Sequence, residues 1–188
     1  MRLRLNYFTG RNSVEIAEDL LGKVFVHETP QGRISGILCE TEAYRQDDEA
    51  CHAYGGRRTP KTEVMFWRSG HLYVYFTYGM YFCCNIVTGE PDCAEAVLIR
   101  GVIPLEGEDI MRQNRGWEKK GLKGLCDGPA KFAIAFGLDK KHNGVDLLDA
   151  ESTLYLEDRG HSFQKFLTTP RIGISRSKEL LWRFVGKD

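Results

Sequence analysis

The segment LYVYFTYGMYFCCNIV, residues 72–87, constrains the fold of this chain more than any other. It contains two runs rich in aromatic and β-branched residues, and a glycine at position 79 separates them. Runs of this kind on either side of a turn residue are typical of neighbouring antiparallel strands. We therefore expect a hairpin here, and a sheet for it to join.

Side chains alternate between the two faces of a strand, which assigns the residues of this segment to faces. Tyr73 and Tyr75 share one face, and Val74 and Phe76 share the other. We expect Val74 and Phe76 to lie against the core. Tyr78 is beside the turn glycine, where a large side chain protrudes more readily than it packs.

The same patterns predict the other elements. Asn12 followed by Glu15 fits a capping box and predicts a short first helix, and residues 23–44 predict a hairpin. Further strands are expected in AVLIRGVI, TLYLED and RIGIS, and helices in GEDIMRQ and GPAKFAIAFG. Residues 45–71 read as a long loop. Consecutive strands favour the α+β class, with a mixed, largely antiparallel curved sheet flanked by short helices in one compact domain, residues 1–188.

Charge and cysteine usage limit the possible partners. The 26 basic side chains balance 26 acidic ones, which argues against nucleic-acid binding through bulk positive charge. Basic residues do gather in GGRRTPK and in residues 112–123, either as solvated loops or as phosphate-binding ones. The six cysteines have no C-x-x-C spacing, so we expect buried thiols and no metal site. Without a signal or membrane segment, we expect an intracellular protein, in the cytoplasm or nucleoid if its source is bacterial.

Residues 40–44, ETEAY, hold the first candidate for chemistry. Alternation places Glu40, Glu42 and Tyr44 on one face where a strand meets the long loop. They form either an ordinary solvent face or a carboxylate poised to activate water, with a second polar group to orient it. Asn85 and Arg100 interrupt apolar strands and must find polar partners, in the core or in a polar pocket.

Five blocks of this sequence together carry a resemblance, in order and spacing. They are ETEAY, DEACHAYGGRRTPK, LYVYFTYGMYFCCN, VLIR and GPAK. The chain resembles the alkyladenine (3-methyladenine) DNA glycosylase family from about residue 12 to the RIGIS segment. The resemblance implies an enzyme of base excision repair that flips a damaged purine out of double-stranded DNA and hydrolyses its bond to deoxyribose. It also implies no metal, no organic cofactor and no membrane partner.

The resemblance further implies roles for individual residues. Glu42 matches the general base that deprotonates a water, and Arg100 matches an arginine that holds this water and a nearby phosphate. Asn85 matches a residue that crowds the exocyclic amino group of guanine. Tyr78 matches the residue that fills the gap left by the flipped nucleotide.

The remaining implied residues bind the base and the backbone. Tyr44 and His52 are expected on one face of the flipped base, with Tyr75 on the other. Aromatic stacking suits many bases and favours positively charged ones. The basic turn is expected near the DNA backbone, through Arg57, Arg58 and Lys61. A single compact domain searching for one lesion is compatible with a monomer.

Other functions stay open from the residues alone. A metal-dependent nuclease would use Glu40, Glu42 and acidic loop residues as ligands for a hard cation. A lesion-binding module would flip and stack bases without cutting the bond. A bifunctional lyase would need an amine nucleophile such as Lys23, Lys61 or Lys131.

Overall fold

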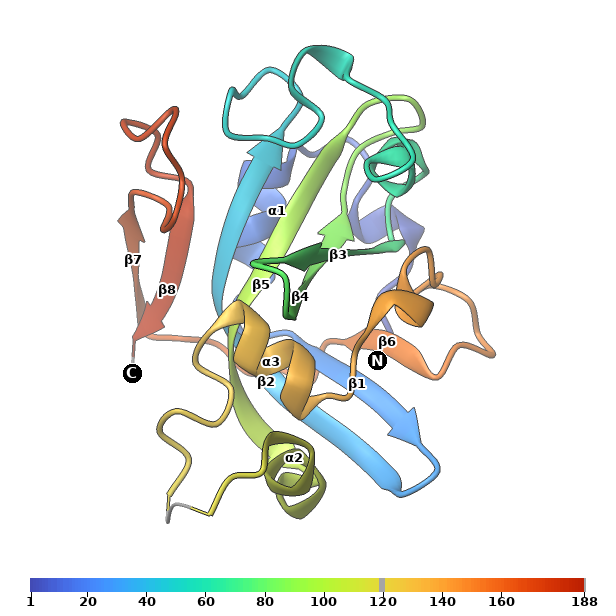
Figure 1. Cartoon of the computed structure of the whole chain (residues 1–188), viewed down its shortest axis with the longest axis vertical. Helices are drawn as coiled ribbons and strands as arrows, with labels where there is room; N and C mark the ends of the chain where they lie inside the picture. The colour runs from blue at the N-terminus through green and yellow to red at the C-terminus, as the bar shows by residue number, and fades with distance from the viewer. Residues whose placement is uncertain (119–120, 188) are drawn as a thin grey trace.

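The computed structural model describes residues 1–118 and 121–187 (Figure 1). Lys119 and Lys120 of the predicted basic segment lie outside the described residues. Eight strands are assigned in the described part of the chain: β1 (Val24–Thr29), β2 (Gly32–Arg45), β3 (Leu72–Thr77), β4 (Tyr81–Val87), β5 (Glu95–Glu106), β6 (Leu154–Glu157), β7 (Lys165–Thr169) and β8 (Arg183–Lys187).

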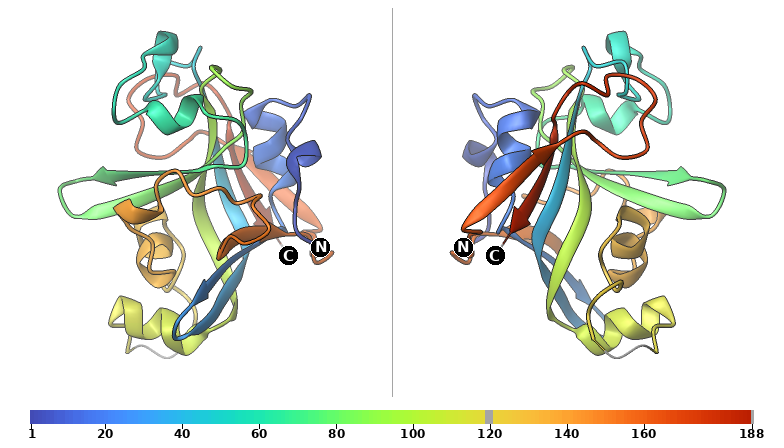
Figure 2. Two further views of the ribbon diagram at one scale, coloured as in Figure 1. Left: turned by 90° about the vertical axis from the view of Figure 1, so that its right-hand side faces the viewer. Right: turned by 90° about the vertical axis from the view of Figure 1, so that its left-hand side faces the viewer.

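These strands form one sheet in the order β3-β4-β5-β2-β1-β6. β8 pairs with both β2 and β7, and every strand pair among the described residues is antiparallel. Register shifts interrupt the pairing of β2 with β5, as expected where a long sheet bends. Both strands curve through the molecule in Figures 1 and 2. The predicted α+β class and curved antiparallel sheet are confirmed.

Short helices cover this sheet. They are α1 (Ser13–Asp19), α2 (Glu108–Arg115) and α3 (Pro129–Ala135), with four 3-10 turns, η1 (Leu5–Tyr7), η2 (Tyr54–Gly56), η3 (Glu63–Phe66) and η4 (Lys140–His142). The capping box at Asn12 forms as predicted, because its side chain accepts from Glu15 N–H while the Glu15 carboxylate accepts from Asn12 N–H. α3 has Pro129 in its first turn, where the missing N–H costs nothing.

The β3–β4 hairpin projects sideways from the body of the molecule (Figure 2). Val74, near its base, is buried as predicted, and Tyr73, for which no burial was predicted, is buried as well. Phe76 is 53% exposed, so its expected place in the core is wrong. The strand parity was correct, but the outer half of the hairpin extends beyond the core. There the Phe76 ring lies beside that of its cross-strand neighbour Phe82, with ring centroids 5.2 Å apart.

The C-terminal region differs most from the expectation. The RIGIS segment is irregular rather than a strand, because Gly173 has a φ of 79° and turns the chain out of the extended conformation. Strands β7 and β8 were not predicted. β7 precedes the RIGIS segment in the chain, and β8 follows it.

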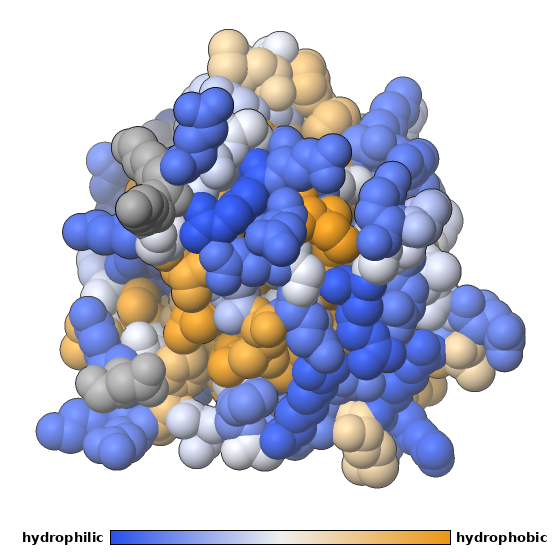
Figure 3. Space-filling view, turned by 90° about the horizontal axis from the view of Figure 1, so that it is seen from below, coloured by the Kyte–Doolittle hydropathy of each residue, from blue (hydrophilic) through white to orange (hydrophobic). Residues whose placement is uncertain are grey.

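Among the described residues no helix is both long and apolar enough to cross a bilayer. The side of the molecule on which α2 lies is mostly hydrophilic, with hydrophobic groups confined to small areas (Figure 3).

Candidate active site

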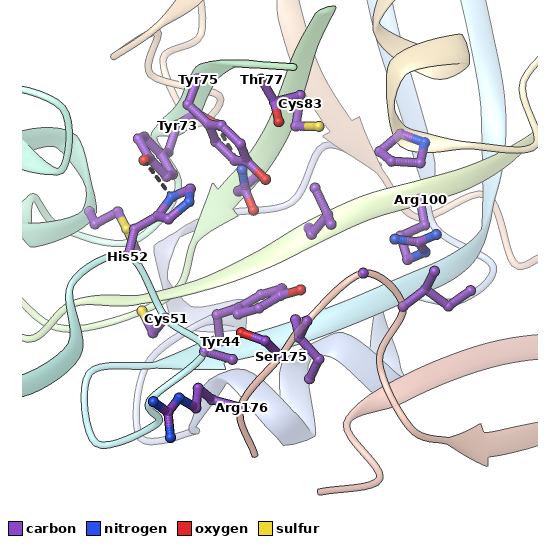
Figure 4. Close-up of a pocket in the computed structure, with 18 of the residues that line it drawn as sticks. Tyr44, Cys51, His52, Tyr73, Tyr75, Thr77, Cys83, Arg100, Ser175 and Arg176 are labelled. Atoms are coloured by element: carbon purple, nitrogen blue, oxygen red, sulfur yellow. Dashed lines mark hydrogen bonds between the residues drawn. The ribbon is translucent and has the colours of Figure 1, made fainter. Parts of the chain in front are cut away.

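A pocket of about 330 Å³ opens beside the β3–β4 hairpin (Figure 4). Its walls come from five places: the hairpin with the neighbouring strands, the loop at residues 49–52, η3, the start of α3, and the irregular segment at residues 172–176. Six of the residues implied by the sequence line it together, namely Tyr44, His52, Tyr75, Tyr78, Asn85 and Arg100. The fold therefore brings these six into one site from four strands, the hairpin turn and a loop, all between residues 44 and 100.

Two tyrosine rings form opposite walls of the pocket. Figure 4 shows Tyr44, from β2, across the open space from Tyr75, from β3. His52 lies on the Tyr75 side, where the two rings meet edge to face with centroids 4.6 Å apart and an interplanar angle of 84°. The predicted pairing of His52 with Tyr44 is therefore wrong. A flat ligand would have Tyr44 on one face and both His52 and Tyr75 on the other.

His52 is held by two polar neighbours. Its Nδ1 lies 3.1 Å from the Tyr73 hydroxyl, and its Nε2 lies 3.5 Å from the Lys61 ammonium. An ammonium only donates, so Nε2 accepts, and the ring proton lies on Nδ1 and is donated to Tyr73. His52 keeps part of its surface in solvent, but desolvation of the ring against its neighbours, together with repulsion from Lys61, lowers the pKa of His52 to about 4. His52 is thus a neutral ring at physiological pH.

Glu42 is a completely buried carboxylate at the side of this pocket. Its Oε2 accepts from the Tyr44 hydroxyl at 2.8 Å, and its Oε1 accepts from Ile172 N–H at 2.7 Å. The guanidinium Nε of Arg100 lies 3.4 Å from Oε1. Tyr44, Ile172 and Arg100 all line the pocket, whereas Glu42 is not among the lining residues and lies directly behind these three. Its orientation is fixed by all three.

Arg100 is oriented in turn by Glu40. The Arg100 Nε donates to Glu40 Oε1 at 2.9 Å, and the same oxygen accepts from Arg183 Nε at 2.7 Å. This arrangement uses the Nε of Arg100 and leaves its two terminal nitrogens without a protein acceptor among the described residues. Alternation had predicted that Glu40, Glu42 and Tyr44 share a face, and their common contacts agree with it.

Asn85 lies on the wall of the pocket, and Tyr78 lies at its rim. Asn85 is buried and donates from Nδ2 to the Tyr73 carbonyl at 3.2 Å, and within the described part of the chain its Oδ1 has no hydrogen-bond donor. Tyr78 is 82% exposed at the tip of the hairpin and has a φ of 51°. The ring of Tyr78 is therefore directed to solvent at the end of the projecting hairpin (Figure 2).

The sequence comparisons identify the family. The pattern of the family described as "Methylpurine-DNA glycosylase (MPG)" matches residues 7–188. The chain belongs to the methylpurine-DNA glycosylase family. It is a DNA glycosylase by family, as the resemblance implied.

Individual bacterial relatives agree with this assignment. Three of them carry the name "Putative 3-methyladenine DNA glycosylase". The relative from Desulfitobacterium hafniense is 41% identical over 191 residues, which cover 96% of this chain and 93% of the relative. The one from Clostridium acetobutylicum is 41% identical, with coverage of 94% and 90%. The one from Carboxydothermus hydrogenoformans is 42% identical, with coverage of 96% and 93%.

The three basic residues predicted at the DNA backbone differ in their surroundings in this glycosylase. Arg57 is exposed. Arg58 is engaged within the protein, by Glu63 and by Asp92, with nitrogen–oxygen distances of 2.7 and 2.6 Å. Lys61 lies beside the pocket, where its Nζ is 5.1 Å from the centre of the Tyr75 ring.

The sequence prediction missed the segment at residues 172–176. It supplies the N–H that holds Glu42, and Ser175 and Arg176 on the pocket wall. The side chain of Arg176 is 71% exposed, with only a distant contact of 3.9 Å to Glu49. Gly173 within a predicted strand was the one local signal of an irregular backbone. The contact with Glu42 spans 130 residues and leaves no local trace in the sequence.

The donor groups at this site are poorly suited to a metal. Within residues 1–118 and 121–187 no group of three or more His, Cys, Asp or Glu side chains is placed to hold an ion. Two guanidinium groups already share the Glu40 carboxylate. The ligand set imagined for a nuclease, Glu40 with Glu42 and loop acids, is therefore not assembled.

Proposed function

We propose that this protein excises alkylated or deaminated purines from duplex DNA by flipping the base into the pocket and hydrolysing its N-glycosidic bond. The observation that carries this proposal is the buried Glu42 carboxylate, fixed beside a pocket with facing tyrosine rings. A flipped purine fits the space between Tyr44 on one face and Tyr75 with His52 on the other. Stacking of this kind contributes about 1–3 kcal/mol per base.

In the proposed reaction Glu42 is the general base. A water molecule gives one proton to the Glu42 carboxylate, and its oxygen forms a bond to C1′ of the deoxyribose. The bond from C1′ to the base nitrogen breaks, and its electron pair leaves with the base. A positively charged base such as 3-methyladenine departs neutral, whereas hypoxanthine needs a proton from another source.

Arg100 supports this step electrostatically. Its Nε is occupied by Glu40, so its terminal nitrogens are available for the water or for a phosphate of the flipped nucleotide. Asn85, buried on the pocket wall, selects against guanine by crowding its exocyclic amino group. Tyr78 at the hairpin tip fills the space left in the duplex, which offsets part of the few kcal/mol that flipping costs.

The decisive experiment measures release of free base from an alkylated duplex in EDTA. We expect the native protein to release 3-methyladenine in chelator, which a metal-dependent nuclease would not do. Glu42→Gln should lower the single-turnover rate by about 10²–10⁴-fold, the usual contribution of general acid–base catalysis, while lesion binding persists. Unchanged base release by Glu42→Gln would contradict the mechanism. Binding without release by the native protein would favour the lesion-binding alternative.

The same reaction tests whether the enzyme is monofunctional. Lys23 and Lys131 pair with Asp158 and Asp127, and only Lys61 lies beside the pocket. We propose that water, not an amine, attacks the sugar, with one protein copy per lesion. Borohydride should then trap no covalent complex with DNA, whereas a trapped complex that Lys61→Gln abolishes would establish a lyase.

A further inference from the structure

Arg171 is a buried cation directly behind the pocket. Its side chain is completely inaccessible to solvent, and so is that of its ion-pair partner Asp48. Two of its nitrogens, Nε and Nη2, are buried without a hydrogen-bond partner among the described residues. Such a pair stabilises a fold little compared with apolar side chains of the same volume, because both charges lose their hydration. A contribution to stability therefore does not explain why the Arg171–Asp48 pair is buried at this position.

The contacts of Arg171 converge on the strand that carries the catalytic residues. Its Nη1 donates to the Ala43 carbonyl at 2.8 Å as well as to the Asp48 carboxylate. Its guanidinium carbon lies 4.6 Å from the centre of the Tyr44 ring and 5.2 Å from that of Trp182. Ala43 is the residue between Glu42 and Tyr44, so one side chain fixes the backbone between the general base and the stacking ring.

The backbone of Arg171 acts on the same carboxylate from the other side. The next residue, Ile172, donates its N–H to Glu42 Oε1 at 2.7 Å. Asp48 completes the connection, because its Oδ1 accepts from Ala50 N–H in the loop that forms another pocket wall. Burial alone would raise the pKa of Asp48, but the hydrogen bonds from Arg171 and Ala50 outweigh it and lower the pKa. The pair is thus charged on both sides.

We propose that Arg171 is a positioning residue, which aligns Glu42 and Tyr44 by joining β2, the loop at residues 48–52 and the segment at residues 172–176. This inference rests on the proposed function, in which Glu42 activates water. It assigns Arg171 no contact with DNA. Its effect passes through the Ala43 carbonyl, the Tyr44 ring and the Ile172 N–H.

The test removes the pair without leaving an unpaired buried charge. The double variant Arg171→Met with Asp48→Asn keeps a long side chain against Tyr44 and an acceptor for Ala50 N–H. A control with the same hydrogen-bond pattern exists in the pair of Arg68 with Asp146, whose side chains are 40% and 26% exposed. There too the arginine donates to a backbone carbonyl, that of Ser69, and the aspartate accepts from the N–H two residues on, that of Leu148. Arg68→Met with Asp146→Asn is the same double change away from Glu42.

Single-turnover base release and binding of a lesion duplex are measured for both variants, well below their melting midpoints. We expect the rate of the Arg171 variant to fall about tenfold or more, and by a larger factor than its affinity, since misalignment acts on the reacting step. The control should stay within about threefold of the native rate, a small barrier change. A native rate for the Arg171 variant, or an equal loss in the control, would overturn the proposal.

A second variant covers the case in which the double variant does not fold. Arg171→Lys keeps the charge, but an ammonium cannot present the planar fork of a guanidinium to the ring and both acceptors. We expect a slower base release at a melting midpoint near that of the native protein, and a native rate would again overturn the proposal. If the native protein itself releases no base, the proposed function fails, and this outcome is distinct from failure of the Arg171 assignment.

Discussion

His52 makes contact with three groups whose chemistry keeps it neutral. Its ring touches Tyr75, its Nδ1 faces the Tyr73 hydroxyl, and its Nε2 faces the Lys61 ammonium. A protonated His52 ring would be repelled by the Lys61 ammonium, and its positive charge would be poorly hydrated. A neutral imidazole also stacks against a positively charged base without repulsion, which suits the alkylated purines of the proposed function.

The lowered pKa of His52 predicts how stability depends on pH. Its pKa is about 4 in the folded protein and 6.5 in an unperturbed chain. As the pH falls from 6.5 towards 4, the unfolded chain binds a proton that the folded protein does not, so stability decreases over this window. Above pH 6.5 the residue is neutral in both states and contributes no pH dependence.

We expect His52→Gln to lose less stability than the native protein on acidification from about pH 7.5 to about pH 5, because glutamine binds no proton in either state. Urea denaturation at both pH values measures the two losses. The difference between the proteins isolates His52, since the other titrating groups are common to both. Equal losses would mean that His52 takes up a proton as readily when folded as when unfolded.

At the scale of elements, the tip of the β3–β4 hairpin holds Tyr78, the residue predicted to insert into DNA, in a strained backbone conformation. Tyr78 and Gly79 both have positive φ, and Met80 N–H donates to the Thr77 carbonyl at 3.2 Å, which is the pattern of a type I′ turn. Glycine adopts this conformation without strain. For tyrosine this conformation costs about 1–2 kcal/mol. The exposed Tyr78 side chain, which contributes little to the fold, therefore occupies a position whose backbone conformation disfavours tyrosine.

We predict that Tyr78→Asn has opposite effects on the stability of the protein and on its release of base from DNA. Asparagine tolerates the left-handed conformation, so the free energy of unfolding should stay the same or rise by up to about 1 kcal/mol. Base release at limiting enzyme should fall, because nothing fills the gap in the duplex. Tyr78→Phe, which keeps both ring and strain, should resemble the native protein in each measurement. A loss of stability in Tyr78→Asn would instead show that Tyr78 packs against the fold.

Elements with a local pattern were predictable from the sequence, and those fixed by distant contacts were not. Alternation predicted the hairpins and the shared face of Glu42 and Tyr44, and the capping box predicted α1. β7 escaped prediction because four of its five side chains are exposed, so no alternation marks it. The RIGIS segment looks like a strand because isoleucines alternate, but its Ile172 N–H bonds to Glu42 instead of to a strand. Family resemblance, not pattern, supplied the roles of His52, Asn85 and Tyr78.

Across the whole molecule, a net charge of zero limits the role of bulk attraction in DNA binding. Cations must therefore act locally, and Arg176 on the pocket wall, Lys61 beside the pocket and Arg57 in the same basic turn as Lys61 are exposed. Arg58 is already neutralised by Glu63 and Asp92. In the proposed function, this separation of charge would keep non-specific binding weak while the phosphates near a flipped base still meet positive groups.

This arrangement predicts the salt dependence of binding to a lesion duplex. Each phosphate neutralised contributes a slope of about −0.9 to log K against log salt, so three contacts give about −2.7. Arg176→Gln should make the slope shallower by about 0.9. Arg58→Gln should change it less, because its guanidinium is already paired, and Lys165→Gln at the start of β7 should leave it as in the native protein. Fluorescence anisotropy over a salt series measures all four proteins. A native slope steeper than about −5 would require more than five phosphate contacts, and would place the basic residues 112–123 on the DNA as well.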